Sequence, residues 1–250
     1  MANELYILTV VLNPGKLLEK TLTSLYSQPF NDFKHIIVDG GSSDGWENNY
    51  DWPKWFRTSV IKIEDKGLYE GLNNAVSLVP HSNFFMFLHA GDEIVSDTYL
   101  NTASQAIINS AALDIIYSDV VFHRPTGEVF RRFSAGRFNF SKLQRGWCPP
   151  HTSLIITKRF YNEVGPHNET YLISGDYEWM IRAFRRNPNS LYVRSWSVSM
   201  LEGGLSSGKD LRLFLAKLEE DYRALKTFSS FPALVCLAKR ILKIFQWMKK

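Results

Sequence analysis

Phe84-Phe85-Met86-Phe87-Leu88-His89-Ala90-Gly91-Asp92-Glu93 is an apolar run that stops at a small residue, a glycine and two carboxylates. The run has the length of a strand, and strands buried on both faces of a sheet are continuously apolar. Ligands of open α/β sheets bind just outside the carboxyl ends of the strands. A carboxylate at that place, such as Asp92, suits a hard divalent cation that is shared with substrate phosphates. An ordinary polar turn is the alternative interpretation of this segment alone.

The size and charge of the chain bear on the number of domains and on nucleic-acid binding. Its 250 residues suffice for one large α/β domain or two small ones. The formal net charge is +4, and residues 231–250 carry five positive charges and no acidic residue. Without those five charges the remainder has a formal charge of −1, so its composition does not predict a nucleic-acid-binding protein.

The cysteines and the apolar runs bear on the compartment. Cys148 and Cys236 form neither a metal-ligand spacing nor a disulfide framework, which fits a reducing compartment. No apolar run reaches the roughly 18–20 residues that span a bilayer, and no signal-type segment begins at Met1. We therefore predict a cytoplasmic protein, with the inner face of the cell membrane as a further expected location.

Hydrophobic periodicity predicts alternating strands and helices over most of the chain. In the first half it predicts strands at 5–12, 33–38, 59–63, 84–88, 114–122 and 128–133, and helices at 17–26, 69–78 and 97–110. In the second half it predicts an irregular segment at 134–150, strands at 152–157 and 191–200, and helices at 176–186 and 209–228. The strand–helix–strand start implies a right-handed βαβ unit and an α/β fold.

Polar, glycine-rich turns follow three of the first four predicted strands: Asn13-Pro14-Gly15, Asp39 to Gly45, and His89 to Glu93. In a doubly wound sheet such turns meet at one edge and form one site. The glycines let backbone N–H groups approach phosphates, and the carboxylates suit ribose hydroxyls or a base edge. Neither a G-x-G-x-x-G fingerprint nor a phosphate-binding G-x-x-x-x-G-K-[ST] loop is present, which argues against NAD, FAD and P-loop ATPases.

An ordered set of short motifs resembles glycosyltransferase family two, whose members have the GT-A fold. The motifs are Leu8-Thr9-Val10-Val11-Leu12-Asn13, Ser24-Leu25-Tyr26-Ser27-Gln28, Ile36 to Gly45, Glu64-Asp65-Lys66-Gly67-Leu68-Tyr69 with Asn73, Ile116-Tyr117-Ser118-Asp119, Pro150-His151-Thr152-Ser153, Ser174-Gly175-Asp176-Tyr177-Glu178 and Gly203-Gly204-Leu205-Ser206. They cover roughly residues 5–206. Within the family, the set is similar to the type that builds colanic acid, capsule and exopolysaccharide.

This resemblance implies a fold and a division of the chain. The fold would be a Rossmann-like, mostly parallel central sheet flanked by helices, with a C-terminal helical extension. Residues 1–228 would form the GT-A domain, with a nucleotide-sugar half at about 1–122 and an acceptor half at about 123–228. Residues 229–250 would form a basic amphipathic helix.

The resemblance also implies a donor site. Asp39 would contact the nucleotide base, with Thr9, Asn13 and Ser42 nearby, while Asp65 and Lys66 would lie near the ribose and diphosphate. Asn73, Ala90 and Gly91 complete the expected donor-binding set. Asp92 would bind Mg²⁺ or Mn²⁺, the expected cofactor, which offsets charge on the leaving diphosphate. The sequence departs from the family's metal-binding motif at His89 and Ala90, and His89 is open as a ligand, a phosphate contact or a packed turn residue.

Inverting sugar transfer needs a base for the acceptor hydroxyl, and the resemblance implies Asp176. An N-cap of the predicted helix is the alternative role for Asp176, and Glu178 is the second candidate base. His151 is expected to bind the acceptor or the diphosphate, or to be structural. Ser206 belongs to a predicted lid or phosphate contact, with a simple strand-to-helix turn as the alternative.

The C-terminal residues 231–250 alternate apolar and basic residues at helical spacing. Such a helix can lie in an anionic membrane interface, as would suit a lipid-linked acceptor. Packing on the domain or on a second copy in a homo-oligomer is the alternative.

The predicted function is therefore an inverting glycosyltransferase. It would move a hexosyl or N-acetylhexosaminyl group from a UDP- or GDP-sugar to a glycan or lipid-linked acceptor in surface polysaccharide synthesis. A non-catalytic sugar-nucleotide-binding or scaffold protein with a degenerate metal motif is the alternative. A sugar-1-phosphate nucleotidyltransferase is a third interpretation, but Asn13-Pro14-Gly15-Lys16 is too short for its glycine-rich loop.

Overall fold

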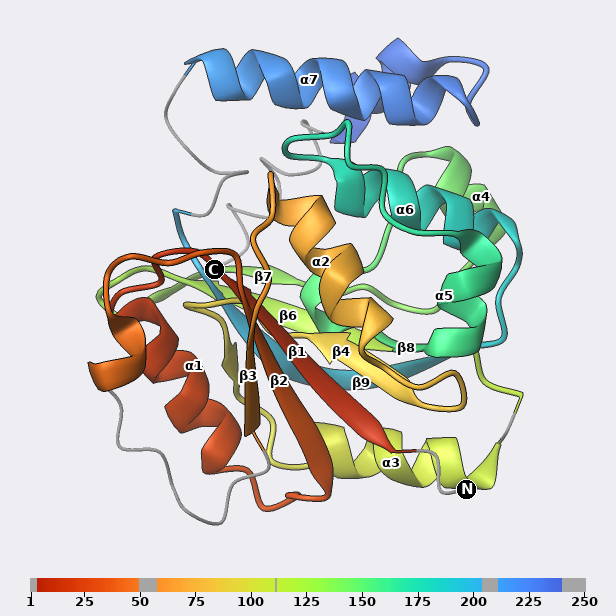
Figure 1. The fold of residues 1–250 in the computed structure, drawn as a ribbon. Coiled ribbons are helices and arrows are strands. Elements are labelled where there is room, and N and C mark those ends of the chain that lie inside the picture. The colour runs from red at the N-terminus through yellow and green to blue at the C-terminus, as the bar shows by residue number, and fades with distance from the viewer. Residues whose placement is uncertain (1–3, 50–57, 111, 204–210, 240–250) are drawn as a thin grey trace.

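A computed structural model describes residues 4–49, 58–110, 112–203 and 211–239 (Figure 1). Its centre is a nine-stranded sheet with the order β3-β2-β1-β4-β8-β6-β9-β5, and β7 also pairs with β6. The strands are β1 (Leu5–Val11), β2 (Phe33–Asp39), β3 (Thr58–Lys62), β4 (Phe84–Phe87), β5 (Glu93–Ile94), β6 (Ile115–His123), β7 (Val129–Phe133), β8 (Ile155–Thr157) and β9 (Ser190–Leu201). The helices are α1 (Leu17–Tyr26), α2 (Leu68–Ser77), α3 (Tyr99–Asn109), α4 (Phe140–Gln144), α5 (Lys158–Val164), α6 (Gly175–Arg185) and α7 (Leu211–Lys226).

The first half of the sheet is parallel. β1 pairs with β2 and with β4 in parallel, so that Leu5 lies opposite both Phe33 and Phe84. β2 pairs with β3 in the same sense. The carboxyl ends of these strands therefore meet at one edge, as the sequence predicts for the glycine-rich turns.

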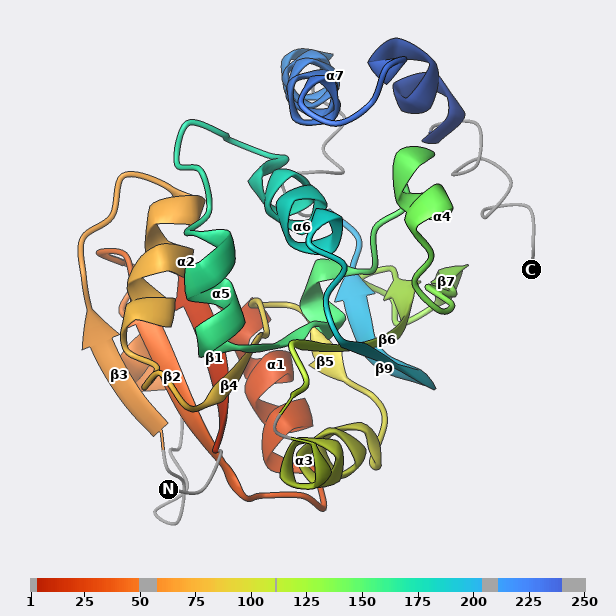
Figure 2. The same cartoon turned by 90° about the vertical axis from the view of Figure 1, so that its right-hand side faces the viewer.

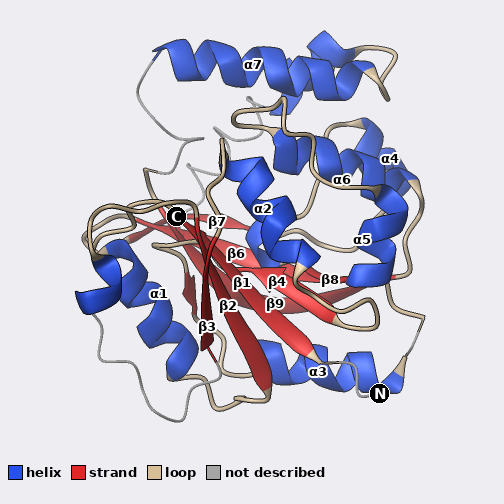
Figure 3. Ribbon diagram, in the orientation of Figure 1, coloured by secondary structure: helices blue, strands red, loops and turns tan. Residues whose placement is uncertain are grey.

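The second half of the sheet is mixed. β8 is antiparallel to both β4 and β6, β9 is parallel to β6, and β5 is antiparallel to β9. One sheet thus runs through both halves of the chain. This α/β sheet with helices on both sides confirms the predicted fold class (Figure 3).

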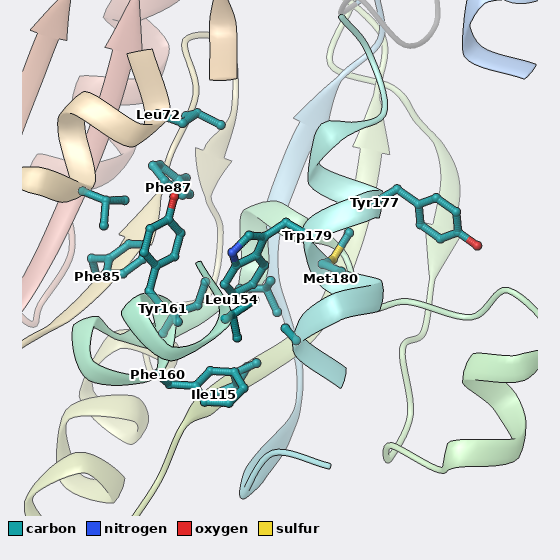
Figure 4. Close-up of a cluster of buried hydrophobic side chains, with 14 of the residues drawn as sticks. Leu72, Phe85, Phe87, Ile115, Leu154, Phe160, Tyr161, Tyr177, Trp179 and Met180 are labelled. Atoms are coloured by element: carbon teal, nitrogen blue, oxygen red, sulfur yellow. The ribbon is translucent and has the colours of Figure 1, made fainter. Parts of the chain in front are cut away.

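Alternation of side chains along the strands creates two apolar layers. On one face Leu5 and Ile7 of β1 join the core that holds α3 and Leu25 of α1. On the other face Tyr6 and Leu8 join the core that holds α2, α5 and α6. Figure 4 shows Trp179 and Met180 of α6 in this second cluster, as expected for an amphipathic helix.

The second half also contains features that the sequence did not predict. Residues His151–Ser153 form a 3-10 turn instead of the start of a strand, because the Ser153 hydroxyl donates to the carbonyls of Ser118 and Pro150. The unpredicted helix α5 begins where the Thr157 hydroxyl accepts from the N–H of Phe160. Helix α4 lies in the segment expected to be irregular, and Asn139 caps it.

The C-terminal part lies over α6. Helix α7 crosses above α6, and helical residues 232–239 follow beside it (Figures 1 and 2). Within the described residues no helix is long and apolar enough to cross a membrane.

Candidate active site

The turns after β1 and β2 form one hydrogen-bonded unit. The N–H of Asn13 donates to the Ser42 hydroxyl at 2.7 Å, and the Asn13 side-chain carbonyl accepts from the N–H of Ser43 at 2.8 Å. The N–H of Gly15 donates to the Asp44 carboxylate at 2.9 Å. Asn13 has φ 49°, a left-handed conformation that asparagine adopts more readily than most residues. The predicted donor residues Asn13 and Ser42 therefore lie together.

Asp39, at the end of β2, organises this unit. Its Oδ1 accepts from the N–H groups of Gly41 and Ser42, and its Oδ2 accepts from the Trp46 indole at 3.1 Å. Burial acts to raise the pKa of Asp39, but hydrogen bonds from Ser42, Trp46 and Gly41 outweigh burial and lower that pKa. The carboxylate is thus ionised and fixes the shape of the turn.

Asp65 packs into a space left by two glycines. A Cβ on Gly40 would lie 2.5 Å from Asp65 Oδ2, and a Cβ on Gly71 would lie 2.8 Å from the same oxygen. Burial is the largest cause of the raised pKa of Asp65, and the charges of Glu70 and Asp39 add to it. The predicted pair Asp39 and Asp65 is therefore brought together at one edge.

The turn of the central stretch is held by α1. The Thr21 hydroxyl donates to the His89 carbonyl at 3.2 Å and accepts from the N–H of Gly91 at 2.9 Å. Gly91 has φ 95°, and a Cβ there would meet Leu201 at 3.1 Å, so the turn requires glycine. Nothing in the sequence distinguishes Thr21 from any other buried residue of an amphipathic helix.

Asp92 lies beneath this turn. Its Oδ1 accepts from the N–H of Leu201 at 3.3 Å. Burial, with a smaller contribution from the Glu93 charge, raises the pKa of Asp92 to about 7. A cation near this carboxylate would favour the ionised form.

Three histidine rings pack together beside the turn, His89 stacked on His151 and His167 edge to face with His151. The ring centres of His89 and His151 lie 6.0 Å apart, and the centres of His151 and His167 lie 5.6 Å apart. Phe87 packs against all three rings. Burial lowers the pKa of His89 to about 3 and also lowers the pKa values of His151 and His167. All three imidazoles are therefore neutral at physiological pH.

Among the described residues, the Nε2 atoms of His151 and His167 are buried without a hydrogen-bond partner. Asn73, a predicted donor-binding residue, holds the loop of His167. Its side chain accepts from the Tyr161 hydroxyl and the His167 N–H and donates to the His167 carbonyl. The sequence gives no signal for His167, which lies in a polar loop after Pro166.

Asp176 occupies the first turn of α6 and is partly exposed. Its Oδ1 accepts from the N–H of Tyr177 at 2.7 Å. The ring of Tyr69 packs so closely on Gly175 that a Cβ there would lie 2.7 Å from it. Burial raises the pKa of Tyr69 and the charge of Asp176 adds to this effect, while the charge of Asp176 partly offsets the lowering of the pKa of His151 by burial. Asp176 therefore lies beside Tyr69, and its charge acts on His151.

Other predicted site residues contact neighbouring protein groups. Thr9 is fully buried and its hydroxyl contacts His35 Nε2 at 3.0 Å, which places it in the layer beneath α1. Glu178 forms a two-point ion pair with Arg182, at 2.7 and 3.0 Å. The backbone N–H of Lys66 donates to Glu70. Ser206 lies outside the described residues.

The comparisons with known proteins bear on this arrangement. Residues 6–189 match the family Glycosyl transferase family 2. The chain belongs to this family. A PGL/p-HBAD biosynthesis glycosyltransferase of Mycobacterium tuberculosis is 25% identical over 259 residues, covering 98% of this chain and 97% of the relative. An uncharacterized glycosyltransferase of Methanocaldococcus jannaschii is 21% identical over 68% of the chain and 60% of the relative. These relatives do not confirm the narrower resemblance to the colanic-acid and capsule type.

Two solved structures have the same GT-A fold as this chain. The S. aureus TarS 1–349 structure in complex with UDP-GlcNAc superimposes with a TM-score of 0.65 at 15% identity, covering 88% of this chain and 64% of that one. The Pyrobaculum calidifontis mannosyltransferase in complex with GDP-Man and Mn²⁺ has a TM-score of 0.58 at 11% identity, covering 89% and 62%. The chain thus spans a little under two thirds of these two solved chains.

GT-A glycosyltransferases generally use a divalent metal, and Asp92 is the carboxylate to test for one. Among the described residues no group of three His, Cys, Asp or Glu side chains is arranged to hold a metal ion. Mg²⁺ is commonly held by one or two carboxylates together with substrate phosphates. The raised pKa of Asp92 fits this requirement, because a nearby cation would relieve the cost of ionising the buried carboxylate.

Proposed function

We propose that this family 2 member is an inverting glycosyltransferase that uses a UDP- or GDP-sugar. The observation that carries the proposal is the position of Asp176, partly exposed on the first turn of α6, where its charge acts on the buried His151. His151 stacks on His89, which begins the turn that contains Asp92. A carboxylate is thus close to the edge of the sheet where the donor turns meet.

The donor would lie over the turns after β1, β2 and β4. Asp39, Asn13 and Ser42 form a rigid unit that would hold the nucleotide, and Asp65 adjoins it through Gly40. Ala90 and Gly91 would present the backbone of their turn to the diphosphate, with Lys66 as a cationic partner. Residues 1–122 would act as the donor half, and residues 123–228 as the acceptor half.

Transfer would use the carboxylate of Asp176 as general base. It would take the proton of the acceptor hydroxyl as that oxygen bonds to the anomeric carbon. The bond from this carbon to the nucleoside diphosphate breaks at the same time, which inverts the configuration. Such a base contributes roughly 10²–10⁴-fold in rate. Neutral His151, whose Nε2 has no partner among the described residues, would orient the acceptor or the diphosphate.

Asp92 would hold Mg²⁺ or Mn²⁺ together with the diphosphate. The cation would offset the negative charge of the leaving group. A single protein ligand makes this site dependent on the donor, so metal and nucleotide should bind together.

The acceptor would be a glycan or a lipid-linked sugar of a surface polysaccharide or glycolipid. A relative is named for PGL/p-HBAD biosynthesis, which supports a glycoconjugate acceptor. A lipid-linked acceptor would place the enzyme at the inner face of the cell membrane, in line with the basic residues of 231–250.

A donor screen followed by product analysis tests the proposal. Thermal shifts are measured with UDP- and GDP-sugars, with and without Mn²⁺, because a ligand of the folded state raises the melting temperature. Stabilising donors are then incubated with an extract of lipid-linked acceptors. We expect release of nucleoside diphosphate and a product of inverted anomeric configuration. Retained configuration, or release of pyrophosphate instead, would reject the proposed reaction.

A non-catalytic sugar-nucleotide-binding protein is the second candidate. The single carboxylate of the 89–92 turn favours it, because burial raises the pKa of Asp92 to about 7 and so disfavours the ionised form that binds a metal. Donor binding that Mn²⁺ does not change, without turnover on any acceptor, would support this second function.

A further inference from the structure

Charge is distributed very unevenly along the chain. Residues 129–150 and 222–250 together hold twelve of the 29 Lys and Arg residues and none of the 25 Asp and Glu residues. The rest of the chain therefore has a formal charge of −8. Such separation creates a strong local potential only if the two acid-free segments lie together.

The fold does bring the described parts of these segments together. A Cβ on Gly146, just after α4, would lie 2.6 Å from Val235 and 3.0 Å from Lys239. The ring of Phe140 in α4 meets the ring of Phe228 edge to face at 5.9 Å. Figure 2 shows α4 next to the helical residues that follow α7. The exposed cations of Arg137, Lys142 and Arg145 thus border the C-terminal helix.

That helix is apolar on its outer side. Val235 and Lys239 pack inward on Gly146, and Cys236 is buried. Phe231, Leu234 and Leu237 point outward with exposed fractions of 68%, 64% and 57%, at a spacing of three residues. Phe140 is also exposed, at 45%. These four apolar residues with Arg137, Lys142 and Arg145 are called the docking face below.

We propose that the docking face binds the surface of an anionic lipid bilayer. The apolar side chains would enter the interface between headgroups and acyl chains, and the cations would meet anionic headgroups. The positive charge of the docking face favours an anionic bilayer over a second copy of the chain. A symmetric dimer would place each basic face against the same basic face, which is repulsive.

The helix that carries part of the docking face contacts, through its inner side, the residue next to the proposed base. Lys239 Nζ lies 3.2 Å from the centre of the Tyr177 ring, and Tyr177 follows Asp176 directly. A bilayer at this face would deliver a lipid-linked acceptor next to α6. This consequence rests on the proposed function, whereas binding of the bilayer does not.

Vesicle co-sedimentation of the full chain, without donor or acceptor, tests the proposal. Vesicles of phosphatidylcholine alone are compared with vesicles that also contain phosphatidylglycerol. We expect binding only to the anionic vesicles, weakened by added salt. The variant Lys142→Glu/Arg145→Glu should lower the partition coefficient by at least about fivefold for each positive charge lost. The variant Leu234→Ser/Leu237→Ser should lower the same coefficient.

Matched controls lie on other surfaces. Ile108→Ser on α3 and Arg194→Glu on β9 alter exposed residues of the same kinds and should leave the partition coefficient unchanged. Melting temperatures confirm that each variant is folded. Equal binding to both vesicle types, or unchanged binding of both docking-face variants, would overturn the proposal. So would a concentration-dependent dimer that Leu234→Ser/Leu237→Ser dissociates. A failure of sugar transfer would leave these measurements unaffected.

Discussion

Glu220 of α7 accepts a hydrogen bond of 2.7 Å from the backbone N–H of Ser174, the residue that precedes the helix carrying Asp176. The same carboxylate accepts from the N–H groups of Leu172 and Ile173, at 2.6 and 2.9 Å. Next to it, Asp221 accepts from the Ser174 hydroxyl at 2.8 Å. Helix α7 therefore fixes the start of α6, and with it the direction of the Asp176 side chain.

Glu220→Ala should lower both stability and turnover. Loss of the carboxylate leaves three backbone N–H groups without their acceptor, for about 3 kcal/mol in the free energy of unfolding. We expect kcat to fall more than the donor KM rises, because the donor turns are untouched. Formate or acetate should restore part of kcat by refilling the site. The exposed neighbour substitution Glu219→Ala is the control. An unchanged kcat in folded Glu220→Ala would contradict a positioning role.

The contact of Asp65 with two glycines predicts a coupled pair. Gly40→Ala should destabilise the protein and weaken donor binding, because its Cβ would lie 2.5 Å from Asp65 Oδ2. The double variant Gly40→Ala/Asp65→Ala should recover part of the lost stability, which denaturant titration can measure in a double-mutant cycle. Gly67→Ala, where a Cβ meets nothing within 4 Å, is the control. Additive effects of the two substitutions on the free energy of unfolding would show that Gly40→Ala does not destabilise the protein through contact with Asp65.

Asp92 predicts a pH dependence of stability. Its pKa is raised from 3.8 to about 7 on folding, so the folded protein binds this proton more tightly than the unfolded chain. The contribution of Asp92 to the free energy of unfolding is therefore greatest at acid pH. This contribution falls as the pH rises from 3.8, the pKa in the unfolded chain, to about 7, the pKa in the folded protein. We expect Asp92→Asn to remove this loss, on the order of a few kcal/mol.

Metal binding gives the second measurement on Asp92. Ionised Asp92 should bind Mn²⁺ with UDP, so the thermal shift by Mn²⁺ and UDP should be larger near pH 8 than near pH 6. That difference should vanish in Asp92→Asn. An equal Mn²⁺ shift in the wild type and the variant would assign the metal to other groups.

Substitutions of His151 and His167 should affect turnover and stability differently. His151→Phe keeps the stacking on Phe87 and His89 and removes a nitrogen without a partner among the described residues. We expect stability to change by less than about 1 kcal/mol and turnover to fall at least tenfold. His167→Phe loses the 2.9 Å contact with the Tyr161 hydroxyl and should cost about 1 kcal/mol in stability. Unchanged turnover in His151→Phe would make His151 purely structural.

Local patterns predicted the turns of the site, because each turn is a short polar segment after a continuous apolar strand. The strands β1, β2 and β4 follow from such runs, and parallel pairing then brings Asp39 and the 89–92 turn to one edge. The same reasoning could not place Thr9. Its side chain faces the layer beneath α1, where His35 satisfies it.

Contacts between distant segments lay beyond sequence reasoning. Glu220 and Ser174 are separated by 46 residues, and nothing in a polar helix marks one glutamate as an acceptor for a remote loop. Likewise, Asn73 belongs to a motif of the family, but its side chain is engaged by the loop of His167. Such pairings depend on how α2, α6 and α7 pack in three dimensions.

The most direct test of the account is the turnover of Asp176→Asn, with Asp97→Asn as a matched control at an exposed site. Donor affinity is measured by thermal shift, and nucleoside diphosphate release is measured at saturating donor and acceptor. Asp176→Asn should bind the donor like the wild type and release nucleoside diphosphate at least roughly 10²-fold more slowly, while Asp97→Asn behaves as the wild type. Wild-type turnover in Asp176→Asn would contradict the assignment of Asp176 as the base.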